Sequence, residues 1–284
     1  MLHARSKLIA SLFVSLLVLG LAAHPASSQS AWYGIREGPV DEERCKAGIA
    51  RIRAQIEAEP EMARAKSFHE YYYLAPRPQD FVEAFRFVGA SAEYRLHENS
   101  LDVCWFYSMV MRQHPERIVE WSVALADLPE SYRPVLYRSL ELAHTPESAI
   151  ALRFLAERAD PLERPHVLSR ATKQPPDLLT MEVETEIDLR ALWGAFQATG
   201  DVRYVMRVIE SSCAPPARPG RGMASTLRWS LKAKAFQHSL VADLCRAEAA
   251  RAEPGCASGL REIVEQVDAI VAVCGRIEDV LLIR

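Results

Sequence analysis

The sequence predicts an all-α protein built from stacked helix hairpins or from an irregular bundle of short helices. Apolar residues recur at spacings of three and four along the chain, which is the period of an amphipathic helix. The two-residue alternation of a half-buried strand is absent, and glycine is scarce, with 12 in 284 residues. Prolines followed by glutamate recur at even intervals, as expected for repeated helix starts.

The first 28 residues have the pattern of a secretory signal peptide. Arg5 and Lys7 precede an uncharged apolar run at 8–23, and Pro25 and several small residues follow it. We expect cleavage after Ser28 or nearby. The alternative is a retained anchor helix, although the run of 16 residues is shorter than the roughly 20 that a membrane-spanning helix needs.

Removal of this segment leaves 32 basic and 37 acidic residues, a formal charge of −5. A mildly acidic chain has no overall attraction for nucleic acid, so we expect no nucleic-acid partner. No later run is apolar and long enough to cross a membrane. The sequence therefore predicts a periplasmic or secreted protein without an integral membrane segment after signal cleavage.

Three helices are predicted before residue 90. The first covers 41–58, the second runs from 61 to about 74, and the third follows prolines at 76 and 78. Acidic residues in the first turn suit the positive end of the first helix. One face of that helix carries Cys45, Ile49, Ile52 and Ile56, and one face of the third carries Phe81, Phe85 and Val88.

Residues 101–171 have the most regular organisation. Proline is favoured at the first helical position because that residue needs no backbone donor. Thr145 can cap the helix that starts at Pro146, and Asp160 with Glu163 resembles a capping box. The prolines that punctuate the region are Pro115, Pro129, Pro146 and Pro161.

The spacing of these prolines indicates a repeat. Pro115 and Pro146 are 31 residues apart, and Pro129 and Pro161 are 32 apart, so each unit would hold two short helices. Such short helices are marginal alone and must bury their apolar faces against neighbours. The alternative is an irregular bundle with evenly spaced loops. The predicted core of this region consists of Ile118, Trp121, Leu125, Leu136, Leu140, Ile150, Phe154 and Leu155.

The segment 188–210 resembles the first helix and turn of a tetratricopeptide repeat. In that family a large apolar residue, a small residue, an aromatic residue and a Gly-Asp turn occur in this order, and the matching residues are Leu192, Ala195, Phe196, Gly200 and Asp201. The segment departs from the family pattern at Trp193, where glycine is usual. The resemblance implies a helix-hairpin fold and no particular ligand. The chain also resembles uncharacterised secreted bacterial helical proteins, which implies no activity.

Two prolines at 175 and 176 mark a linker at 172–182. We therefore expect an N-terminal helical array at 29–171 and a C-terminal helical part at 183–284, or one continuous domain. A loop rich in proline and glycine covers 213–222. The C-terminal helices are predicted at about 223–236, 238–252 and 257–272, with a short final segment at 277–283.

All six cysteines lie beyond the signal segment. In an exported protein an even number permits disulfides, and six cysteines allow fifteen complete pairings. Cys45 and Cys104 lie within apolar helical patterns, so we predict that they are buried thiols. One or two bridges are expected among the cysteines nearer the C-terminus, which are Cys213, Cys245, Cys256 and Cys274.

No catalytic, cofactor or metal-site signature is present. The histidines form no HxxxH or HxH pair, and the chain has no CxxC, GxSxG, SxxK or phosphate-binding loop. Alternating acids at 182, 184, 186 and 188 would point to different faces of a helix, which favours a solvated helix start over a pair of catalytic acids. We therefore predict no metal and no cofactor.

Two features are candidate partner-binding surfaces. Consecutive aromatic residues at 71–73 and 105–107 would spread around a helix, so that some of them face solvent. A basic stretch without acids at 211–242 suits an acidic partner or an anionic surface. The alternatives are burial of the aromatic residues and solvation of the basic ones. The candidate residues are Tyr71, Tyr72, Tyr73, Trp105, Tyr107, Arg218, Arg221, Arg228, Lys232 and Lys234.

The sequence alone favours a non-enzymatic protein- or peptide-binding or scaffold protein of the cell envelope. Helical arrays expose extended concave surfaces that hold such partners, an argument from fold analogy. Two alternatives stay open. One is a hydrolase whose acid and base come from different helices, and the other is an immunity-type inhibitor of an envelope toxin.

Overall fold

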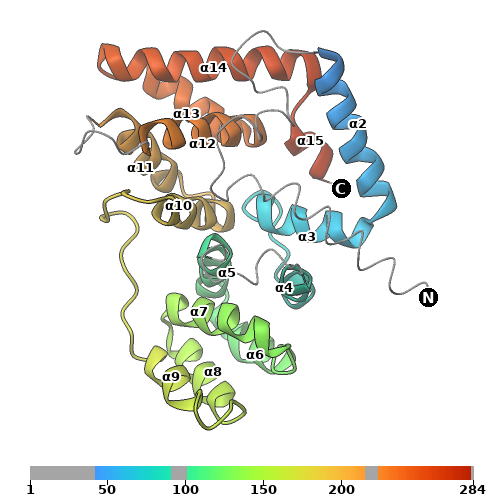
Figure 1. Ribbon diagram of the computed structural model, residues 1–284, viewed down its shortest axis with the longest axis vertical. Coiled ribbons are helices and arrows are strands. Elements are labelled where there is room, and N and C mark those ends of the chain that lie inside the picture. The colour runs from blue at the N-terminus through green and yellow to red at the C-terminus, as the bar shows by residue number, and fades with distance from the viewer. Residues whose placement is uncertain (1–41, 91–100, 215–222, 283–284) are drawn as a thin grey trace. The chain divides into compact units, whose positions relative to one another are not determined.

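The computed structural model describes residues 42–90, 101–214 and 223–282, and all regular structure in these ranges is helical (Figure 1). The prediction of an all-α fold is therefore confirmed. The predicted signal segment at 1–28 lies outside the described residues. None of the described helices is long and apolar enough to span a bilayer.

Contacts divide the chain into two compact units, each made of separate stretches of the sequence. We call the first the disulfide unit; its described residues are 42–67, 183–186 and 205–282. We call the second the aromatic unit; its described residues are 68–90, 101–182 and 187–204. The first predicted helix therefore belongs with the C-terminal helices, because it is bonded to one of them.

The disulfide unit is built around its longest helix, α14 (Pro254–Cys274). Helices α12 (Met223–Gln237) and α13 (Ser239–Ala249) pack against α14 and against each other. Helix α2 (Glu42–Ala58) packs on α14 and on the short α15 (Ile277–Leu281). The buried stripe of α14 has the helical spacing predicted from sequence and holds Leu260, Ile263, Val267 and Ile270.

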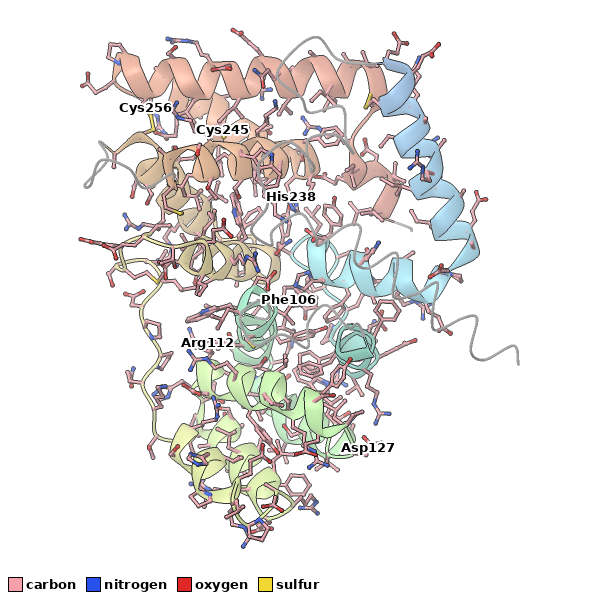
Figure 2. All side chains as sticks on the ribbon, viewed as in Figure 1. Phe106, Arg112, Asp127, His238, Cys245 and Cys256 are labelled. Carbon is pink, nitrogen blue, oxygen red and sulfur yellow. A yellow bond between two sulfur atoms is a disulfide. The ribbon has the colours of Figure 1, made fainter. Side chains whose placement is uncertain are left out.

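Two disulfides lie in this unit. Cys45 of α2 is bonded to Cys274, the last residue of α14, with 6.0 Å between Cα atoms. Cys213 is bonded to Cys256, with 5.0 Å between Cα atoms (Figure 2). The first bond joins residues 229 positions apart and therefore ties the two ends of the described chain together.

The sequence-based prediction was right that Cys104 is a buried thiol and that a bridge forms among the four cysteines nearer the C-terminus, since Cys213 is bonded to Cys256. It was wrong for the other three, because Cys274 is bonded outside that group, to Cys45, and Cys245 forms no bridge. Cys45 is not a free thiol. Cys245 is free and buried on α13, and burial raises the pKa of its thiol to about 12. Cys245 belongs to the apolar face of α13 with Val241 and Ala242, so it behaves as a small core residue.

The aromatic unit holds the helices from the middle of the chain. Their bounds are η1 (Pro78–Asp80), α4 (Phe81–Ala90), α5 (Leu101–Gln113), η3 (Pro115–Arg117), α6 (Ile118–Ala124), η4 (Glu130–Tyr132), α7 (Arg133–Ala143), α8 (Pro146–Ala156), α9 (Arg164–Arg170) and most of α10 (Glu186–Thr199). Two further helices, α3 (Pro60–Tyr71) and α11 (Val202–Cys213), each cross from one unit to the other. Within the unit, α5 packs on α7, α6 packs on α8, and α9 packs on both α7 and α8. Helices two apart in the chain therefore lie against each other.

Several predicted helix starts are confirmed. The backbone N–H of Ser148 donates to Thr145 Oγ1 at 3.1 Å, and the N–H of Thr145 donates to Ser148 Oγ at 2.9 Å, which completes a capping box for α8. Asp201 accepts the N–H of Arg203 at 3.0 Å at the start of α11. Gly200 takes a positive φ of 67° at the end of α10.

The predicted start at Pro161 was wrong. Asp160 accepts the N–H of Leu162 at 2.9 Å, which forms a turn, and α9 begins only at Arg164. Of the predicted core of this region, Ile150 is 48% exposed and Phe154 is half-buried, because both lie on the outer face of α8. The other six predicted core residues are buried.

Helix α5 is buried on every side, since nine consecutive residues from Val103 to Met111 are inaccessible. A helix can be apolar all round only when neighbours surround it. Arg112, labelled in Figure 2, extends from its last turn and donates to the carbonyl oxygens of Leu142 at 2.6 Å and Ala143 at 3.0 Å. These carbonyls end α7, so one guanidinium caps the neighbouring helix.

Helix α10 approaches the backbone of α5 closely at Gly194. A Cβ atom there would overlap the carbonyl oxygen of Asp102 and lie 3.1 Å from the backbone nitrogen of Phe106. The backbone of α5 cannot retreat, because its other sides are packed. The close approach of the two helices therefore requires glycine at position 194.

We predict that Gly194→Ala lowers the free energy of unfolding by about 1–3 kcal/mol, because the added methyl group meets rigid backbone. Gly255→Ala is the matched control, since a Cβ on Gly255 of α14 would meet nothing within 4 Å. Urea denaturation should give the control a midpoint at or slightly above that of the unmodified protein. Equal midpoints for the two variants would contradict this account of the α5–α10 approach.

We predict that peptide mapping without reduction recovers the pairs Cys45–Cys274 and Cys213–Cys256. Cys104 and Cys245 should resist alkylation in the folded protein and react after denaturation, because both thiols are buried. Reduction of Cys45–Cys274, whose cysteines are 229 positions apart, should lower the free energy of unfolding by about 2–4 kcal/mol. Recovery of a Cys245 disulfide would contradict the described fold.

Candidate functional site

Four of the five aromatic residues predicted to contact a partner are buried. Tyr71, Tyr72, Trp105 and Tyr107 have exposed fractions of 0–4%. Tyr71 and Tyr72 are not spread around one helix as predicted, because α3 ends at Tyr71 and Tyr72 begins a turn. The other two belong to α5, which has no solvent-facing side. These residues therefore form the core of the aromatic unit, and the prediction that they form a binding surface is wrong.

Tyr73 is half-buried and has a structural role as well. Its ring lies 5.0 Å from the ring of Phe196, and its backbone N–H donates to the carbonyl oxygen of Gln197 at 3.2 Å. A Cβ on Gly200 would lie 2.8 Å from the Tyr73 ring. Tyr73 therefore closes the turn after α10, which leaves little of its side chain for a partner.

Among the described residues, the arrangement most similar to a catalytic site consists of the side chains of Tyr72, His114 and Glu116. The Tyr72 hydroxyl lies 3.0 Å from His114 Nε2, and Glu116 Oε1 lies 3.7 Å from His114 Nδ1. Burial raises the pKa of Tyr72 to about 12, with the charge of Arg117 opposing the shift. The phenol is therefore protonated at neutral pH and is a poor nucleophile. This arrangement does not favour the hydrolase alternative.

The predicted basic stretch is only partly described. Arg218 and Arg221 lie outside the described residues. Arg228 is exposed on α12, and Lys232 and Lys234 are half-buried on the same helix. A Cβ on Gly259 would lie 3.6 Å from the guanidinium of Arg228, so this side chain lies over α14. Arg228 thus covers a packing contact between α12 and α14 within the disulfide unit.

The strongest charged cluster of the aromatic unit was not predicted. Glu141 of α7 is an acidic residue that is only 2% exposed. Arg138 and Arg170 each donate to one of its two oxygens through Nη1, and Lys173 Nζ lies 3.3 Å from Oε1. We call these four residues the Glu141 cluster. It joins α7, the last residue of α9 and the segment that follows α9.

One local pattern in the sequence indicates the Glu141 cluster. Glu141 follows Leu140 on a helix whose apolar stripe it interrupts, and Arg138 precedes it by three residues, a spacing that pairs charges on a helix. Arg170 and Lys173 reach it across 29 and 32 residues, which no local pattern indicates. An acid within an apolar stripe indicates a buried ion pair, but its partners become visible only in the fold.

Large exposed apolar side chains occur in one unit. Within the described ranges, all seven that are more than a third exposed belong to the aromatic unit: Leu74 (44%), Val123 (52%), Ile150 (48%), Leu162 (85%), Leu168 (40%), Ile187 (43%) and Val202 (38%). Four of them lie on α6, α8, α9 and the turn before α9, which are neighbours in the packing. We call Val123, Ile150, Leu162 and Leu168 the apolar positions.

No group of histidine, cysteine or acidic side chains suited to a metal ion occurs among residues 42–90, 101–214 and 223–282. Comparison with known proteins gives no match among family models, curated proteins or solved structures.

Proposed function

We propose that this protein is a non-enzymatic protein- or peptide-binding protein that acts outside the cytoplasm. The observation that carries the proposal is the distribution of exposed apolar side chains over the aromatic unit. The disulfide unit exposes no large apolar side chain to this extent among its described residues. Exposed apolar surface that recurs on adjacent helices is a feature of surfaces that bind other proteins.

The core of the aromatic unit supports the same role, because it holds these helices rigidly. Phe81 stacks on Trp121 with ring centroids 4.0 Å apart, and Tyr107 contacts Phe81 at 5.2 Å and Phe85 at 4.6 Å. A preorganised surface binds with a smaller entropic cost than one that must become ordered. The packing of α5 on α7 and of α6 on α8 is also what a stack of helix hairpins requires, and stacked hairpins commonly bind peptides.

The location outside the cytoplasm is supported by the cysteines and by the N-terminal sequence. Disulfides form and persist in oxidising compartments and are rare in the cytosol. Cys45–Cys274 and Cys213–Cys256 use four of the six cysteines. The signal-like segment at 1–28 provides a route to such a compartment.

We predict that a photoreactive phenylalanine analogue at Leu162 or Leu168 forms a discrete covalent complex with a partner protein in intact cells. Leu162 is the most exposed large apolar residue described, so its substitution should leave the fold intact. The same analogue at Ala269, an exposed position on α14, is the matched control and should give no such complex. Pairing Leu162→Ser with Leu168→Ser should abolish co-purification of the partner.

An identical complex from the α14 position, or co-purification that survives both serine substitutions, would contradict a role for α9. If the analogue gives no complex at any of the four apolar positions, Val123, Ile150, Leu162 and Leu168, tested one at a time, the proposed function itself is contradicted.

A further inference from the structure

The Glu141 cluster carries more positive charge than its own folding requires. Three cations surround one carboxylate, which leaves a local charge of +2 within a chain whose formal net charge is −3. A buried carboxylate is costly unless it is paired and hydrogen-bonded, and Arg138 and Arg170 already occupy both of its oxygens. Lys173 therefore adds a third charge where two suffice.

The cations of the cluster remain accessible although the acid is not. The side chain of Glu141 is 1% exposed, whereas those of Arg138, Arg170 and Lys173 are 29%, 32% and 63% exposed. Each guanidinium has five N–H donors. Within the described ranges, the side chains of Arg138 and Arg170 make no hydrogen bond other than those to Glu141. Their remaining donors are thus available to a ligand.

Glu141 also fixes where these donors lie. Its buried carboxylate anchors one guanidinium from α7 and one from the end of α9, so the two are held close together before a ligand arrives. Two neighbouring guanidinium groups suit a planar carboxylate, because they can each donate to one of its oxygens. Preorganised donors bind more tightly than flexible ones, since less side-chain entropy is lost.

We propose that Arg138, Arg170 and Lys173 bind a carboxylate side chain of an acidic peptide segment. This inference rests on the proposed function and gives its ligand a chemistry. A peptide is favoured over a small inorganic anion because of the exposed apolar side chain on α9, where Leu168 is 40% exposed. Leu168 and Arg170 are two residues apart and face different sides of this short helix, so a ligand that contacts both must pass over it, as a peptide can and an inorganic anion cannot. Only a peptide offers apolar and acidic side chains together.

The test measures fluorescence anisotropy of a short fluorescein-labelled peptide of alternating glutamate and leucine at low ionic strength. The same peptide with glutamine in place of glutamate is the ligand control. Combining Arg170→Ala with Lys173→Ala should weaken binding of the glutamate peptide by about tenfold, since two charge-assisted contacts are lost. The glutamine peptide should bind weakly and equally to both proteins.

The matched protein control removes two other positive charges. Arg203 pairs with Asp201, and Arg246 pairs with Asp243 and Asp268, so neither has excess charge around it. Combining Arg203→Ala with Arg246→Ala should therefore leave affinity for the glutamate peptide within about twofold of that of the unmodified protein.

Glu141→Gln tests whether the buried carboxylate positions the cations. Glutamine keeps the shape of the side chain but replaces one carboxylate oxygen with an amide donor, so at least one guanidinium loses its anchor. Binding of the glutamate peptide should therefore weaken, although less than in the Arg170 and Lys173 variant, because all three cations remain. Tighter binding by this variant would contradict the anchoring role of Glu141. If this variant fails to fold, the paired substitution of the exposed Arg170 and Lys173 still decides the question.

The inference is overturned if the Arg170 and Lys173 variant binds the glutamate peptide as the unmodified protein does, or if the glutamine peptide binds equally well. Full displacement of the glutamate peptide by an equal concentration of inorganic phosphate would identify a general anion site and also overturn it. Photochemical capture of a partner at Leu162 that persists in the Arg170 and Lys173 variant would leave the proposed function standing without this site.

Discussion

Complete burial of α5 is the constraint on which the aromatic unit depends. Nine consecutive residues of this helix are inaccessible, including Trp105, Phe106 and Tyr107. Because every face of α5 needs a neighbour, the surrounding helices must close around it. Gly194 on α10 and the capping of α7 by Arg112 both follow from this requirement, since each concerns an element that meets α5 directly.

The two units are stabilised in different ways. In the disulfide unit, Cys45–Cys274 bonds the first described helix, α2, to the end of α14. In the described part of the aromatic unit the one cysteine, Cys104, forms no disulfide, and the core is built from aromatic contacts instead. Phe68, for instance, lies 5.0 Å from Tyr72 and 5.7 Å from Phe106 between ring centroids.

Local features of the fold were predictable from the sequence, and features that depend on distant residues were not. Apolar periodicity and proline positions located most helices, and Thr145 and Asp201 cap helices as expected. The pairing of Cys45 was missed because its partner is 229 residues away. Ile150 was assigned to the core because periodicity does not reveal which face of a helix has a neighbour.

The candidate site follows the same division. Consecutive aromatic residues suggested a binding surface, yet an all-round buried helix has the same composition, and only tertiary packing separates the two cases. The sequence placed Arg138 beside Glu141 but not Arg170 or Lys173. The charged cluster on α7 and α9 is therefore evident only from the fold. The proposed contact residues are leucines and cationic residues of this region, whereas the sequence alone suggested tyrosines.

Hydrogen exchange of the native protein, followed by mass spectrometry, tests the central role of α5 most directly. Amides within the buried span of α5 should exchange more slowly than those of any other helix in the aromatic unit, because their exposure requires the unit to open globally. The seven-residue α9, of which only Val167 is buried, should exchange far faster. Exchange of α5 at the rate of α9 would contradict the account.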